Sequence, residues 1–298
     1  MATPFTLPEN ECRPLSLPLA GGIEVHEYYL RGKHLPQDNE DGLLATPAGY
    51  VAVIDGVTSK SAFRLDGKAS GRWAMELLAE AISGFPPGLD MPQAVARLTE
   101  AVRAFYARRG LEDYVAGHPS HRFTASVVMF SLARREVWQV GDCPCRVGEA
   151  CYPNAKWIDH LAAEARCAFD QAFLLSGGTR ADVEACDPGR HFIRPLLRMQ
   201  GVFQNRPPVS SPYAYAAIDG FPVPLELVRV YPVCPGEEVV LASDGYPCVL
   251  PSLRASEEYL HAVLASDPLC LSQFKSTKGR QAGLRSFDDR AYVRFTVM

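Results

Sequence analysis

The chain has little excess charge and no long apolar runs. Its 30 Lys and Arg residues stand against 34 Asp and Glu, a formal net charge of −4 over 298 residues. Such a balance leaves no basic footprint for nucleic acid. The longest apolar stretches, such as residues 126–130, are far too short to cross a bilayer. Residues 1–11 show no basic stretch followed by an apolar core, so we expect no secretory signal, no membrane partner and a cytoplasmic location.

The nine cysteines lack any regular spacing, and no pair is separated by two residues. The closest pair, Cys143 and Cys145, flanks Pro144 and is too tight for an ordinary disulfide or a tetrahedral zinc pair. We therefore expect reduced thiols that fill the core, in preference to a metal site.

Strand and helix patterns occur in blocks. Short β-branched or alternating runs predict strands at 23–30, 50–54, 124–131, 136–140, 225–233, 237–243 and 291–297. Helical spacing predicts helices at 70–82, 91–106, 158–175 and 256–265, and a partly helical segment at 187–204. Residues 1–22 are rich in Pro and Leu without a period, which indicates an irregular segment. Because the blocks do not alternate strictly, they favour a single α+β domain over 1–298, not a doubly wound parallel sheet.

Carboxylates recur at the ends of these apolar strands or beside glycine. They are Glu40-Asp41, Asp55-Gly56, Gly141-Asp142, Asp244-Gly245 and Asp288-Asp289. A strand end fixes a side chain while leaving it open to solvent, and hard oxygen ligands from separate strands are what Mg²⁺ or Mn²⁺ requires. Each single Asp-Gly pair is equally typical of a turn, and an acidic pair is typical of a solvated loop.

Taken in order, these motifs and their flanks resemble the metal-dependent protein phosphatases, the type 2C serine/threonine enzymes, and most closely the bacterial members. The resemblance runs from about residue 23 to residue 297. It implies a four-layer α-β-β-α sandwich of two antiparallel sheets flanked by helix pairs. Residues 154–224 correspond to the variable flap of the family.

The resemblance also implies roles for individual residues. It implies that Asp55 bridges two Mg²⁺ or Mn²⁺ ions and that the carbonyl of Gly56 joins their coordination. Asp244 and Asp288 would bind the first ion, and Glu40 would bind the second. Asp41 would hold a metal-bound water, and Asp142 with Asp244 would bind a third, weaker ion. A hydroxide bridging the two ions would then hydrolyse phosphoserine or phosphothreonine in a phosphorylated protein.

Two departures from the family pattern concern substrate binding. Pro36 stands where the family has an Arg that grips the substrate phosphate, and Lys33 or His34 is the nearest replacement. Residues 57–60 replace a glycine pair, and in some members a histidine. These changes keep two alternatives open: a regulatory or binding module with weak catalysis, and a phosphatase for a small phosphorylated metabolite. The physiological substrate and the oligomeric state stay open as well.

Overall fold

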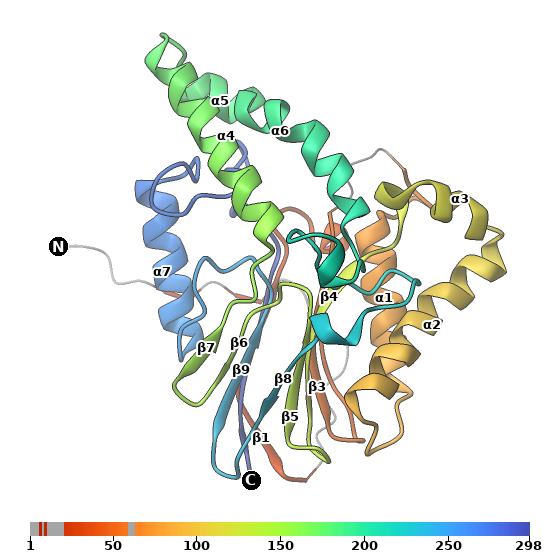
Figure 1. Cartoon of the computed structure of the whole chain (residues 1–298). Coiled ribbons are helices and arrows are strands. Elements are labelled where there is room, and N and C mark those ends of the chain that lie inside the picture. Colours follow the sequence, from red (N-terminus) through yellow and green to blue (C-terminus); the bar gives the residue numbers. More distant parts are fainter. Residues whose placement is uncertain (1–5, 8, 11–20, 59–62) are drawn as a thin grey trace.

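Two five-stranded antiparallel sheets packed face to face form the centre of the molecule (Figure 1). The computed structural model describes residues 6, 7, 9, 10, 21–58 and 63–298. The first sheet has the order β2-β3-β4-β5-β8, and the second has the order β1-β10-β9-β6-β7. The strands are β1 (Ile23–Arg31), β2 (Asp41–Ala45), β3 (Tyr50–Gly56), β4 (Ala125–Ser131), β5 (Glu136–Val140), β6 (Cys145–Val147), β7 (Ala150–Tyr152), β8 (Arg229–Pro232), β9 (Glu238–Ala242) and β10 (Arg290–Val297).

The helices lie outside these two sheets. They are α1 (Ser70–Ser83), α2 (Met91–Arg109), α3 (Glu112–Gly117), α4 (Trp157–Leu175), α5 (Arg180–Cys186), α6 (Pro188–Met199) and α7 (Leu253–Ser266). Single 3-10 turns are η1 (Pro36–Asp38), η2 (Pro119–His121), η3 (Gln200–Val202), η4 (Pro208–Ser210) and η5 (Leu225–Leu227).

The continuous apolar run of β3 reflects burial on both of its faces. Val51 and Val53 point into the core between the two sheets, whereas Ala52 and Ile54 pack in the core beneath α1 and α2. Side chains alternate between the faces of a strand, so a strand covered on both sides has no polar face. This double burial is the signature of the layered fold that the sequence predicts.

Helices α1 and α2 cover the first sheet as the predicted pair. Helix α2 begins with a capping box formed by Asp90 and Gln93, and it ends at Gly110 in the left-handed conformation. On the second sheet α7 packs through Leu253 against residues of β1, β9 and β10. The long helix α4 pairs with α6 above the sheets and does not form a second covering pair with α7 (Figure 1). The predicted α-β-β-α layering is confirmed, with α7 in place of the helix pair expected on that side.

Most predicted elements are confirmed, and the exceptions have local causes. The strand predicted at 225–233 is wrong in its first half, because a 3-10 turn follows Pro224 and β8 starts only at Arg229. Strand β2 was not predicted, since it opens with the turn-like pair Asp41-Gly42. The segment 154–224 contains α4, α5 and α6. Most of the predicted irregular segment 1–22 lies outside the described residues, as do Ser59 and Lys60.

The cysteines of the described segments are all free thiols, and Cys143 and Cys145 are buried between the sheets. Both therefore fill the core, as predicted. The prediction is wrong for other described cysteines, since three are exposed and one is half-buried: Cys151, Cys186, Cys234 and Cys248. Within the described segments, no helix combines the length and the apolar character that crossing a membrane requires.

Candidate metal centre at the strand ends

The predicted carboxylates meet at one end of the sandwich because the strands that carry them begin or end there. Asp41 opens β2 and lies opposite Asp55 near the end of β3. Asp142 follows β5, Asp244 follows β9, and Asp288 precedes β10. A cavity of about 690 Å³ at this end is lined by Asp55, Asp142, Asp244 and Asp288, among others. The structure thus brings together side chains from both sheets that are up to 233 residues apart in sequence, from Asp55 to Asp288.

Asp289 connects the two segments that carry the remaining candidates. Its buried carboxylate accepts hydrogen bonds from the backbone N–H of Lys33 at 2.7 Å and of Glu40 at 3.1 Å. The Lys33 ammonium group donates to the same carboxylate at 3.1 Å. The sequence marked Asp289 only as the partner of Asp288, and the hydrogen bonds identify it as the residue that positions Lys33 and Glu40.

A close backbone contact shapes the site next to Asp55. A Cβ on Gly56 would collide with the carbonyl of Gly71 at the start of α1, and a Cβ on Gly71 would lie 2.5 Å from Oε1 of Glu40. Only glycine at both positions lets the helix end approach β3 and the Glu40 carboxylate this closely.

Burial and repulsion from neighbouring carboxylates raise the pKa of several carboxylates of the cluster. Burial raises the pKa of Asp55 well above its usual range, and the neighbouring charge of Asp244 adds to the rise. Burial raises the pKa of Asp41 as well, and the charge of Asp289 adds to that rise. Burial raises the pKa of Asp244 to about 6, and the charge of Asp142 contributes to it. Oε1 of Glu40 and Oδ2 of Asp41 are buried without a hydrogen-bond partner.

Ammonium groups supply part of the missing charge at Asp288. Lys33 Nζ lies 2.9 Å from Asp288 Oδ1, and Lys278 Nζ contacts Asp288 Oδ2. The two ammonium groups outweigh burial and hold the pKa of Asp288 below its usual range. Across the described parts of the chain, no three His, Cys, Asp or Glu side chains are arranged as a ready metal cage.

The donor set nevertheless fits a hard divalent cation. Its donors are carboxylate and carbonyl oxygens, the ligands that Mg²⁺ and Mn²⁺ prefer. Two of its buried oxygens have no hydrogen-bond partner, and burial raises the pKa of three of its carboxylates. Binding a divalent ion at Asp288 would require the two lysines to share or release that carboxylate.

The structure separates the two predicted phosphate-binding candidates. Lys33 joins the carboxylate cluster, whereas His34 is 56% exposed and pairs with Asp38 at 3.3 Å. Pro36, which stands in the place of the family's arginine, opens the 3-10 turn η1.

Two lysines of the site were not predicted as site residues. Lys278 comes from the segment 275–278, whose Lys-Ser-Thr-Lys sequence is the signal that could have identified it. Lys156 immediately precedes α4, and its Nζ lies 2.7 Å from Asp142 Oδ2. A lone lysine before a helix offers no such signal.

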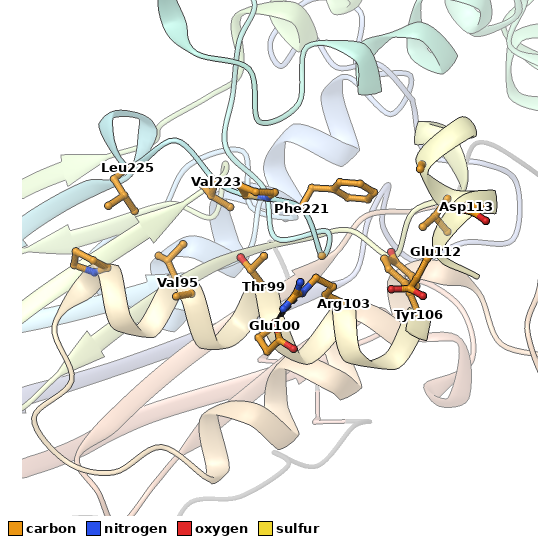
Figure 2. A pocket seen from close by; sticks show the side chains of 16 residues that line it. Val95, Thr99, Glu100, Arg103, Tyr106, Glu112, Asp113, Phe221, Val223 and Leu225 are labelled. Atoms are coloured by element: carbon orange, nitrogen blue, oxygen red, sulfur yellow. Dashed lines mark hydrogen bonds and ion pairs between the residues drawn. The ribbon is translucent and has the colours of Figure 1, made fainter. Parts of the chain in front are cut away.

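A second cavity lies on the outer side of the first sheet, between α2, α3 and residues 220–225 (Figure 2). It has a volume of about 650 Å³, and Val95, Val223 and Leu225 give it an apolar wall. Glu112 and Asp113 lie at its α3 end. None of the predicted site residues is among those that line it.

Comparison with known proteins gives structural matches only. No family model and no curated protein sequence matches the chain. Among solved structures, the chain is similar to PppA, a regulatory component of T6SS in Pseudomonas aeruginosa, at 17% identity and a TM-score of 0.46, over 94% of this chain and 99% of that one. It is similar to the catalytic domain of the serine/threonine phosphatase PstP in complex with two manganese ions, at 14% identity and a TM-score of 0.48, over 93% and 99%. It is also similar to the PPM Ser-Thr phosphatase MsPP from Mycobacterium smegmatis, at 14% identity and a TM-score of 0.42, over 94% and 100%. At these identities the likeness concerns the fold alone.

Proposed function

We propose that this chain is a Mg²⁺- or Mn²⁺-dependent phosphatase that hydrolyses phosphoserine and phosphothreonine in proteins. The observation that carries the proposal is the meeting of strand-end carboxylates from both sheets in one cavity of about 690 Å³. Hard oxygen donors gathered around a solvent-open cavity suit divalent ions that act on a phosphoryl group.

The proposed ligands follow the ordered motifs. Glu40, Asp55, Asp244 and Asp288, with the carbonyl of Gly56, would hold two ions. When bound, these ions supply Lewis acidity, which activates water for attack on phosphorus and neutralises charge on the phosphoryl oxygens. Asp41, which has an unpartnered oxygen opposite Asp55, would orient the attacking water.

Lysines would bind the substrate phosphate in the absence of the family's arginine. Lys33 and Lys278 approach the cluster from opposite sides of Asp288, and about a fifth of each side chain is exposed. An ammonium group is a point charge without the two-pronged geometry of guanidinium, so it attracts phosphate with less control of orientation.

The test is hydrolysis of p-nitrophenyl phosphate and of a phosphothreonine peptide with Mn²⁺, with Mg²⁺ and with EDTA. We expect turnover that requires metal, and we expect Asp55→Asn to lower it by more than about a hundredfold because the ligand shared by both ions is lost. Asp113→Asn, which changes an exposed aspartate of the second cavity, is the matched control and should keep full activity. Undiminished turnover in Asp55→Asn, or turnover in EDTA, would remove the assignment.

A second candidate function is a regulatory or binding module with weak catalysis. The observation that favours it is the engagement of Asp288 by two ammonium groups, which competes with a divalent ion at the same carboxylate. Mn²⁺ binding in calorimetry without turnover of either substrate would favour this function. Turnover of small phosphoesters without turnover of the peptide would instead favour a metabolite phosphatase.

A further inference from the structure

The ammonium group of Lys156 is enclosed within the carboxylate cavity. Its side chain is only 8% exposed, and its Nζ lies 2.7 Å from Asp142 Oδ2 and 3.9 Å from Asp159 Oδ2. The ring of Tyr215 contributes a third contact, with its centroid 5.2 Å from Nζ. Lysine is rarely buried to this extent unless it is paired. The cation is therefore a fixed part of the cavity wall.

Both carboxylate oxygens of Asp142 already have a partner in the chain. Oδ1 accepts a hydrogen bond from the hydroxyl of Ser126 at 2.5 Å, and Oδ2 is held by Lys156. In the described part of the chain, Asp55 and Asp244 of the same cavity form no salt bridge with a Lys, Arg or His side chain.

This contrast divides the carboxylates of the cavity into two groups. Asp142 is already paired with a buried ammonium group of the chain itself, whereas Asp55 and Asp244 have no such partner. Asp288 is paired as well, but its partners Lys33 and Lys278 are each about a fifth exposed, so their ammonium groups can turn to solvent when a divalent ion binds. A divalent ion at Asp142 would have to displace a buried ammonium group, and an unpaired buried ammonium group is costly.

We propose that Lys156 is a resident cation that reserves Asp142 and limits the metal centre to two divalent ions. The proposal rests on the proposed function, because it presupposes a centre at Asp55, Asp244 and Asp288. It replaces the third, weaker ion that the sequence assigned to Asp142. The ammonium group keeps a positive charge on that side of the cavity at every metal concentration, which an exchangeable ion would not.

The test counts bound Mn²⁺ by the electron paramagnetic resonance signal of the free ion during a titration. We expect two ions for the wild type and three for Lys156→Met, which removes the charge but keeps the apolar stem. The third ion should disappear again in the double variant Lys156→Met/Asp142→Asn. Lys275→Met, which removes an exposed lysine paired with Glu164, is the matched control and should bind two.

Asp142→Asn alone provides a second measurement that does not depend on the folding of Lys156→Met. If Lys156 reserves Asp142, the stoichiometry of this variant stays at two, whereas loss of an ion would show that Asp142 is a ligand and would overturn the proposal. Three ions in the wild type, or two in a folded Lys156→Met, would also overturn it while leaving the proposed function intact. A wild type that binds no Mn²⁺ would overturn the proposed function and this inference together.

Discussion

Replacing Arg166 by methionine should destabilise the protein through loss of a buried charge network. Arg166 lies in α4 with no exposed surface, and its guanidinium group donates to both carboxylate oxygens of Asp187 at 3.1 and 3.0 Å. It also donates to the carbonyls of Leu269, Cys270 and Ser276 at 2.9, 3.2 and 3.0 Å. One side chain therefore fastens α4 to the start of α6 and to the segment that carries Lys278.

The expected loss can be worked from these contacts. Arg166→Met leaves the Asp187 carboxylate without its main partner and leaves three carbonyls without this donor. Breaking a buried ion pair by removing one partner costs about 3–5 kcal/mol, and methionine retains much of the apolar volume. We therefore expect the free energy of unfolding to fall by about 3–5 kcal/mol. Arg254→Met, which removes an exposed pair with Glu258, is the control and should cost at most about 1 kcal/mol.

Urea denaturation of the metal-free protein measures the free energy of unfolding of the wild type and of both variants. A second readout is amide hydrogen exchange over residues 269–278, which should accelerate in Arg166→Met and not in Arg254→Met, because only the former frees that segment. If the free energy of unfolding of Arg166→Met lay within about 1 kcal/mol of the wild-type value, the network would not contribute the stability assigned to it.

Two further predictions concern single positions. Burial raises the pKa of Asp170 to about 6, so the folded protein holds a proton there that the unfolded chain releases near pH 4. The free energy of unfolding should therefore fall as the pH rises from about 4 to about 6. Asp170→Asn should reduce that fall by on the order of 2 kcal/mol, measured by urea titrations across this pH range. An unchanged dependence of the unfolding free energy on pH would refute the prediction. Gly71→Ala should cost about 1–3 kcal/mol and weaken Mn²⁺ binding in calorimetry, because its methyl group would press on Glu40. Gly117→Ala, where a Cβ meets nothing within 4 Å, should show neither effect, and equal behaviour of the two variants would contradict the steric argument.

The sequence predicted the strands best where both faces are buried. In β4 every residue is buried, and its central apolar run, residues 127–130, could be recognised without knowledge of its neighbours. Strand β2 was not predicted because it opens with Asp41-Gly42, a pair typical of a turn, and only its pairing with β3 shows it to be a strand. The absence of a second covering helix pair could not be predicted either. The place of α4 depends on its packing against α6 and on its contacts with residues 269–276, which are more than 100 residues away in sequence.

The candidate site divides in the same way. The carboxylates were predictable because each stands in a fixed relation to a strand end. Lys156 was not, because its partner Asp142 lies in the connection between β5 and β6, and the pairing depends on how the start of α4 is placed over that connection. His34 and Lys33 are neighbours that the sequence does not distinguish, and the structure distinguishes them because Lys33 donates hydrogen bonds to Asp289, whereas His34 pairs with Asp38.

The distribution of charge in the site indicates where a divalent ion is needed. The backbone ladder fixes the carboxylates, whereas the ammonium groups come from segments outside the strands, as Lys156 and Lys278 do. Those ammonium groups hold the pKa of Asp142 and of Asp288 below the usual range, while that of Asp55 is raised by burial and by neighbouring carboxylates. The negative charge without an ammonium partner is thus that of Asp55, whereas Asp142 and Asp288 are each paired with ammonium groups of the chain. A cation binds most strongly where the negative charge of the protein has no positive partner. The first divalent ion should therefore bind at Asp55. Changes in the segments that carry the lysines would then retune the site without altering the strands that build it.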